Sequence, residues 1–408
     1  MRVPHGRGRT AIAALLCGII APTPLYARPI TLPEVLARAE DNSPSVVQAR
    51  GELAVAAARA RQAGVRPNPQ VNLTVENFAG SGEFRRFRSA EVTLSVSQQF
   101  ELGGKRSSRR AIAAAELEVA ELRVGVARAD VERDARTNFA ELSGASDRVT
   151  LARDAEQRAR ELQRTVTLLV VYGREPPLRG LRAKAALAEA EAATQAAIAA
   201  YARSQRSLAG LLGFGEVDLE ARGAVELLAP AQPTADPGSS LVVRLAAAER
   251  LAAEARVKLE QATAVPDLTA ELGVKRFEGS NDTAVIAGIS VPIPIANRNG
   301  GAIDAARASL NSAEARLSQA RLDAIRSLRG AESDLIAADA RVRALQSSGI
   351  CQAREAVRLA RIGYAAGKFS FLEVLDAQSA LNQAEAALID ARLAQAQAVA
   401  ALMRAQAQ

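Results

Sequence analysis

Two helical patterns of about sixty residues dominate the sequence, and a helix of that length spans about 90 Å, several times the diameter of a small domain. One runs from Gly103-Gly104 to about Val170, and the other runs from Gly300-Gly301 to Ile362. Helices this long cannot lie inside an ordinary globule, so they must pack along one another in a coiled-coil-like bundle. Alanine, which makes up about 90 of the 408 residues, favours helix and lets neighbouring helices approach closely.

Each long helix belongs to a plan that occurs twice. A copy consists of a helix, two strands, the very long helix, a short break and another long helix, and in the first copy the opening helix is predicted over Pro33–Ala63. The segments Leu94-Ser95-Val96 and Ile289-Ser290-Val291 correspond to each other, and a glycine pair precedes the long helix in both copies. We therefore predict a first repeat over residues 28–213, a linker over 214–239 and a second repeat over 240–408.

Four segments alternate apolar and polar side chains, which is typical of strands with one apolar and one polar face. They begin near Val71, Val92, Leu268 and Val285, and the last keeps its alternation as far as Ile295. Each has roughly the length of a tilted strand that crosses a bilayer. Lipid tolerates sheets only as closed barrels, and four strands are too few to close one, so two, three or four chains would have to pool 8, 12 or 16 strands. The alternative is that the strands form soluble appendages on a helical rod.

In a barrel, the polar faces of these strands would line a wet lumen and the apolar faces would meet lipid. The aromatic girdle typical of membrane barrels is incomplete, since only a few phenylalanines lie near the strands. The predicted lumen residues are Asn72, Thr74, Glu76, Thr93, Ser95, Ser97, Thr269 and Glu271, and the nearby phenylalanines are Phe78, Phe84, Phe87, Phe100 and Phe277.

The N-terminus has the pattern of a secretory signal. Basic residues precede an apolar stretch over 11–21, and small Ala27 marks a cleavage site, so residues 1–27 are predicted to be removed. The alternative is an uncleaved anchor helix, although the apolar stretch is too short to span a bilayer. Cys17 raises the question of acylation, but bulky Leu16 directly before it argues against lipidation.

Composition excludes several functional classes. One His and two Cys cannot build a zinc site of four Cys and His ligands or a disulfide framework, and they leave little for histidine-based catalysis. We therefore expect neither an enzyme nor a cofactor. The formal net charge of +7 would suit nucleic acid, but the sequence has no nucleic-acid-binding motif.

The sequence resembles the TolC family of outer-membrane efflux channels, and within it the cobalt–zinc–cadmium resistance type. The resemblance covers nearly the whole chain after residue 27. It rests on Pro67-Asn68-Pro69, Val75-Glu76-Asn77-Phe78, Leu94-Ser95-Val96-Ser97-Gln98, Phe100-Glu101-Leu102-Gly103-Gly104-Lys105-Arg106, Gly363-Tyr364-Ala365-Ala366-Gly367 and Leu372-Glu373-Val374-Leu375-Asp376-Ala377-Gln378.

The resemblance implies a mainly helical fold with a β-barrel part. Four strands per chain would contribute to a homotrimeric, twelve-stranded barrel in the outer membrane of a Gram-negative bacterium, continued by a long periplasmic helical tunnel. It also implies two protein partners, a periplasmic adaptor protein and an inner-membrane, proton-driven pump of the RND type, and outer-membrane lipid around the barrel. The implied function is export of heavy-metal cations. The alternatives are a channel for drugs, small molecules or type I secretion, and a periplasmic scaffold or adaptor without a pore.

The resemblance also implies a gate at the two helical breaks, residues 172–177 and 363–370. Glu373 could alternatively cap the start of a helix. Phe369 stands where some family members carry an arginine that ties the gate shut, and the first break is two residues shorter than the second. The implied gate residues are Tyr364, Lys368, Glu373 and Asp376, and the implied adaptor-contacting residues are Tyr172, Gly173, Arg174, Gly363 and Gly367.

Overall fold

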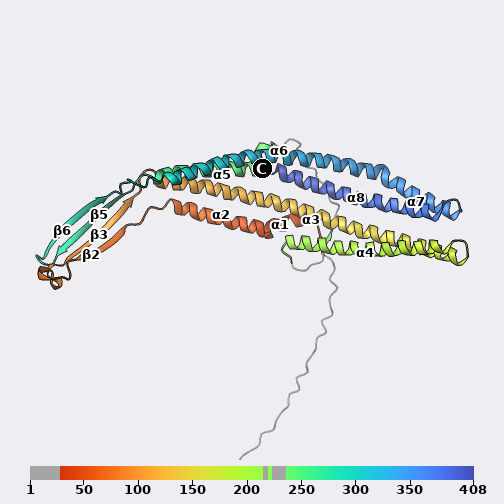
Figure 1. Cartoon of the computed structure of the whole chain (residues 1–408), viewed down its shortest axis with the longest axis horizontal. Helices are drawn as coiled ribbons and strands as arrows, with labels where there is room; N and C mark the ends of the chain where they lie inside the picture. The colour runs from red at the N-terminus through yellow and green to blue at the C-terminus, as the bar shows by residue number, and fades with distance from the viewer. Residues whose placement is uncertain (1–27, 215–218, 223–235) are drawn as a thin grey trace, which may run out of the picture.

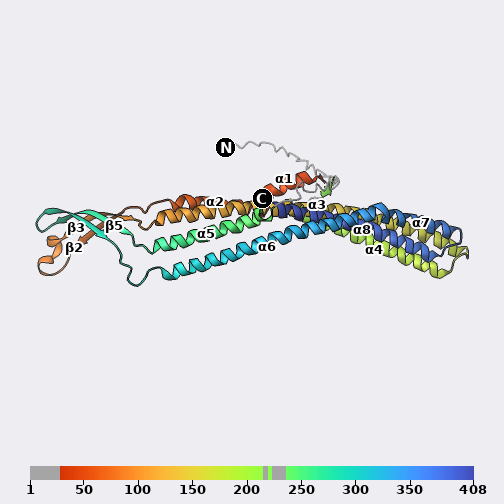
Figure 2. The same cartoon turned by 90° about the horizontal axis from the view of Figure 1, so that it is seen from above.

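The molecule is a long rod with a β-sheet at one end and helices along the rest (Figure 1). The computed structural model describes residues 28–214, 219–222 and 236–408, so the predicted signal segment and most of the predicted linker lie outside the described residues. Viewed from above, the helices run side by side along the rod, and both helical breaks lie at the end opposite the sheet (Figure 2). The mainly helical architecture expected from the sequence is confirmed.

The sheet has the strand order β2-β3-β5-β6, and every neighbouring pair is antiparallel. Strands β2 and β6 are its edges. The prediction that the last strand continues to Ile295 was wrong, because β6 ends at Ser290 and the lack of amide hydrogens in Pro292 and Pro294 prevents a ladder beyond it. The bounds are β2 Gln70–Glu76, β3 Glu91–Phe100, β5 Leu268–Phe277 and β6 Asp282–Ser290.

The two long helical patterns are both helical in the structure. The first is one unbroken helix, α3, whereas the second passes through a π-helical turn at Leu345–Gly349 between α6 and α7. Shorter helices α2 and α5 lead into the strands, and α4 and α8 return from the breaks. The bounds are α2 Pro44–Ala63, α3 Lys105–Val171, α4 Pro177–Leu211, α5 Leu241–Thr263, α6 Gly300–Ala344, α7 Ile350–Ala365 and α8 Phe371–Gln406, with 3₁₀ turns at Gly82–Phe84, Arg86–Ser89 and Pro237–Ser239.

The opening helix is not continuous, so the prediction of one helix over Pro33–Ala63 was wrong. It consists of α1 (Leu32–Asn42) and α2, separated at Ser43. Ser43 has an extended backbone (ψ 126°), because the ring of Pro44 disfavours the helical conformation in the residue before it.

A buried cluster halfway along the rod holds helices α1, α2, α3 and α4 together. Val35 of α1, Phe139 of α3 and Leu208 of α4 are each at most 1% exposed. A short parallel pair of strands, β1 (Arg28–Ile30) and β4 (Leu219–Ala221), covers this cluster. Among the described residues, no helix combines the length and apolar character needed to cross a membrane.

Candidate functional site

The two faces of the sheet are the reverse of those in a soluble protein. The strand register aligns apolar side chains in rows such as Leu73–Leu94–Val274. These side chains are exposed, Leu73 by 67%, whereas polar Thr93 and Ser95 on the other face are 9% and 3% exposed. An exposed, continuous apolar sheet face is what a strand surface in contact with lipid requires.

All eight predicted lumen residues lie on the polar face, because the register gives them the same parity. Asn72 pairs with Ser95, Thr74 with Thr93, and Ser97 with Glu271. Glu76 lies opposite Glu91, and Thr269 lies opposite Gln99 on the same face. The Asn72 amide also donates to the Ser97 hydroxyl (3.4 Å).

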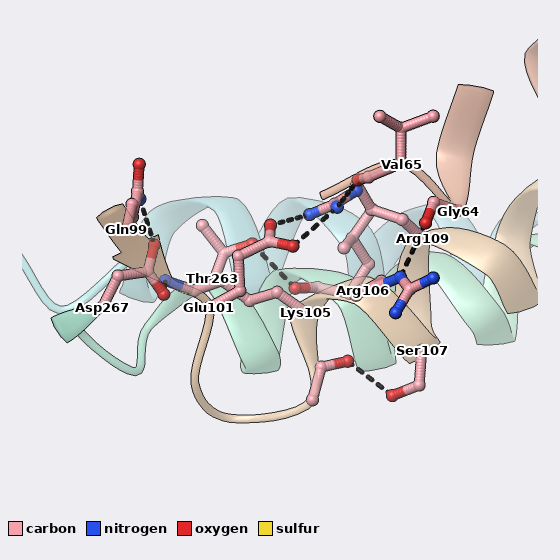
Figure 3. Close-up of polar contacts among 12 residues, drawn as sticks. Gly64, Val65, Gln99, Glu101, Lys105, Arg106, Ser107, Arg109, Thr263 and Asp267 are labelled. Carbon is pink, nitrogen blue, oxygen red and sulfur yellow. Dashed lines mark hydrogen bonds and ion pairs between the residues drawn. The ribbon is translucent and has the colours of Figure 1, made fainter. Parts of the chain in front are cut away.

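An ionic cluster, which we call the junction clamp, lies where the strands meet the helices (Figure 3). It consists of Glu101, Lys105, Arg109 and Asp267. The Lys105 ammonium donates to Asp267 (2.6 Å), and Arg109 binds Glu101 through both of its terminal nitrogens. The clamp therefore joins the start of α3 to the segments before β5 and after β3.

Backbone and amide groups complete the clamp. The Gln99 amide and the Leu102 N–H donate to Asp267, at 2.8 and 3.1 Å. Arg109 also donates to the carbonyl oxygen of Val65, and Arg106 donates to that of Gly64 at 2.6 Å, both just after α2. The ends of three helix–strand connections are thus held at one place.

The clamp shifts the titration of both of its acids. The hydrogen bond from Arg109 lowers the pKa of Glu101 below its ordinary value. Burial alone would raise the pKa of Asp267, but the hydrogen bonds from Lys105, Leu102 and Gln99 together hold that pKa below its ordinary value. Both carboxylates are therefore charged in the folded protein at neutral pH.

At the opposite end of the rod, both helical breaks begin with the same cap. Gly173 and Gly367 have φ angles of +69° and +73°. The N–H of the following residue returns to the carbonyl of Leu169 (2.8 Å) in the first break and of Gly363 (2.8 Å) in the second. This pattern is the Schellman motif, which ends a helix with a residue in the left-handed conformation. That conformation favours glycine, which explains why each break has a glycine at this position.

Tyr364 connects the two breaks. Its hydroxyl donates to Glu175 Oε1 (2.9 Å), and Glu175 is also paired with Arg179. Burial, and then the hydrogen bond to Glu175, raise the pKa of Tyr364 to about 12, so the hydroxyl keeps its proton. Sequence analysis missed Glu175, whose sole signal was a carboxylate inside a predicted break.

The other predicted gate residues are exposed. Glu373 forms a capping box with Ser370 at the start of α8, which is the alternative role considered from the sequence. Asp376 lies one turn further, beside a groove between α3, α4 and α8. Lys368 is exposed in the break itself. Within one chain the structure does not bring these three side chains together with Tyr364.

Phe369 has a definite place in the second break. Its ring lies against Gly363, and a Cβ atom at Gly363 would overlap that ring. The Phe369 ring therefore covers Gly363, which is buried, so Gly363 does not lie on the exposed surface of the break where the sequence placed an adaptor-contacting residue.

Large apolar side chains are exposed around both breaks, where Tyr172 and Val171 are 75% and 74% exposed. An exposed apolar surface of this kind marks an interaction site. The others are Leu168, Leu178, Leu181, Ile362, Phe369 and Leu372. Arg174 lies at the same tip, in the groove that Tyr364 and Gly367 also line.

The sheet exposes its apolar face and is joined by the clamp to a long helical rod. This arrangement is that of outer-membrane proteins in which a β-barrel continues into a helical tunnel. The family model for outer membrane efflux proteins matches residues 35–214 and 239–408, and the chain belongs to that family. The resemblance found in the motifs and the outer-membrane location are thereby confirmed.

Relatives agree with this assignment. The chain is 30% identical over 364 residues to the cobalt-zinc-cadmium resistance protein CzcC of Cupriavidus metallidurans, covering 88% of this chain and 85% of that protein. It is 33% identical over 305 residues to the nickel-cobalt-cadmium resistance protein NccC of Alcaligenes xylosoxydans xylosoxydans, covering 73% and 68%. The crystal structure of the outer membrane protein VceC of Vibrio cholerae has the same fold, with a TM-score of 0.76 at 22% identity over 92% of this chain and 96% of that one.

Proposed function

We propose that this protein is the outer-membrane exit duct of a tripartite efflux pump that exports heavy-metal cations. The exposed apolar face of the sheet carries the channel part of the proposal. The metal part is supported by the relatives, which are named for resistance to cobalt, zinc, cadmium and nickel.

The duct is a homotrimer in this proposal. Strands β2 and β6 are open edges, and an exposed edge needs a partner in lipid. Three chains would join β6 of one copy to β2 of the next and close twelve strands around the polar face. Residues 28–213 and 240–408 would then supply two similar units per chain.

The partners are a periplasmic adaptor protein and an inner-membrane, proton-driven pump of the RND type. The apolar side chains exposed at the breaks, together with Gly173, Arg174 and Gly367, form the surface that the adaptor would contact.

Three copies of Glu373 and of Asp376 would surround the narrow end of the tunnel, where a ring of carboxylates attracts cations. The protein itself would carry out no chemistry.

The metal-ligating side chains of the described residues are compatible with a duct that passes metal ions without holding them. No group of three His, Cys, Asp or Glu side chains there is placed to hold a metal ion. Cys351 is an exposed, unpaired thiol on the helical rod. A duct must release its cargo, so weakly steering carboxylates suit it better than a tight site.

Deletion of the protein in its host, with adaptor and pump intact, tests the proposal. We expect a lower tolerance to zinc, cobalt, cadmium or nickel, restored by expression of the intact chain. Unchanged metal tolerance together with greater sensitivity to dyes or antibiotics would favour the drug-efflux alternative. A monomer that stays soluble without detergent would instead support a scaffold without a pore.

The contact between Tyr364 and Glu175 predicts a looser closed state in Tyr364→Phe. Loss of a hydrogen bond to a charged acceptor costs about 1.5 kcal/mol or more, which corresponds to roughly a tenfold larger open fraction. Single-channel recordings should show larger or more frequent openings. Tyr172→Phe is the matched control, because Tyr172 is 75% exposed at the other break. If both variants conduct like the wild type, the Tyr364–Glu175 contact does not hold the tip closed.

A further inference from the structure

The charges on the polar face of the sheet are unbalanced. Strands β2, β3, β5 and β6 are described in full, and Lys275 is the single basic residue on this face. Arg276 follows it but has the opposite parity and belongs to the apolar face. The acidic residues on the polar face are Glu76, Glu91, Glu271 and Asp282.

Lys275 lies between two of these acids. Its ammonium nitrogen is 3.2 Å from Glu76 Oε2 and is also bonded to Glu91 Oε2. The side chains of Lys275 and Glu91 are 22% and 25% exposed. The Asn77 amide holds the other oxygen of Glu91 at 3.3 Å, so one carboxylate of the pair has partners on both oxygens.

This triad lies at the end of the sheet far from the helices. Glu76 and Glu91 are opposite each other in the last register step of β2 and β3, next to the connection between these strands. In Figure 1 that end is the tip of the molecule. In the proposed duct it is the outer mouth of the barrel, the last place that an exported ion passes.

Two carboxylate oxygens from neighbouring strands that converge on one cation are what a divalent metal ion takes as ligands. Here the cation is the ammonium group of the chain itself. We propose that Lys275 is a tethered counter-ion that keeps Glu76 and Glu91 from binding exported metal at the mouth of the duct. It is a specificity-determining residue, and the proposal rests on the proposed function.

Glu271 provides an internal contrast. It lies on the same face near the helical end of the sheet, and it has no ion pair among the described residues. A single carboxylate attracts cations without coordinating them tightly, so it needs no counter-ion. The basic residue is thus placed where two acids converge and is absent where one acid stands alone.

The test is a comparison of Zn²⁺ binding and Zn²⁺ block in Lys275→Gln and the wild type. Isothermal titration calorimetry on the detergent-solubilised protein should detect a new Zn²⁺ site in the variant. In planar bilayers the half-blocking Zn²⁺ concentration should fall by about tenfold or more. The triple variant K275Q/E76Q/E91Q should lose the new site. Lys258→Gln, which removes an ion-paired lysine on α5, is the matched control.

Each outcome decides one proposal. Equal Zn²⁺ binding by Lys275→Gln and the wild type overturns the counter-ion role, even if both proteins conduct cations. A new Zn²⁺ site that disappears in the triple variant supports that role, even if no protein conducts, in which case the duct function fails instead. A new site that persists in the triple variant places the metal elsewhere and also overturns the inference.

Discussion

Gly103→Ala is expected to destabilise the protein by about 2–4 kcal/mol, because two independent penalties apply at this position. Gly103 has a φ angle of +67°, in the left-handed region that disfavours residues with a Cβ atom. A Cβ atom there would also lie 2.6 Å from Cβ of Val265 and 3.1 Å from the carbonyl oxygen of Ala262. Gly103, the first glycine of the pair, therefore allows close contact between the start of α3 and the end of α5.

The neighbouring glycine separates the two penalties. Gly104 has a similar φ angle of +76°, but a Cβ atom there would approach only the Ser107 hydroxyl, at 3.2 Å. Gly104→Ala should therefore cost about 1 kcal/mol. The double variant G103A/V265G, which removes the Cβ atom of Val265 that the new Cβ atom would meet, should recover part of the loss. The thermal unfolding midpoints of the two single variants and the double variant, measured on the detergent-solubilised protein, test this prediction. Equal midpoints for G103A and G104A would show that the contact with Val265 contributes nothing to stability.

Local sequence patterns predicted most of the fold. A period of two over Val92–Ser97 identified a strand and its polar face, and the register of β3 depends on the same alternation. The long helix α3 was evident from its helical pattern between the glycine pair and the first break. These features depend on residues that are neighbours in sequence, so they are readable without a structure.

Features that depend on a single peptide bond or on distant residues were not predicted. The restriction that Pro44 places on Ser43 divides the opening helix, although the helical pattern continues across it. Tyr364 was expected at the gate, but its partner Glu175 is 189 residues away. Lys105 and Asp267 are 162 residues apart, so no periodicity could pair them. Such contacts arise where segments far apart in the sequence lie side by side along the rod.

Asp267→Asn is expected to destabilise the protein by about 2–3 kcal/mol at neutral pH. The side chains of Lys105 and Asp267 are only 13% and 18% exposed, so the variant leaves a largely buried ammonium group without its counter-charge. Asp267 also accepts the Leu102 N–H and the Gln99 amide, and the asparagine can satisfy only part of this set. Asp304→Asn is the matched control, because Asp304 is 77% exposed in its pair with Arg307 and a surface pair contributes little.

The clamp also predicts how stability depends on pH. The folded pKa values of Glu101 and Asp267 are lower than their ordinary values, so the clamp stabilises the fold fully above the ordinary carboxyl range. As the pH falls below about 4 and through the folded pKa values, both acids gain protons and this stabilisation is lost. The thermal midpoint of the wild type should therefore fall steeply in acid, and that of the double variant E101Q/D267N should fall less. A decline of equal steepness in both proteins would mean that other carboxylates govern acid unfolding and that the clamp only positions the strands.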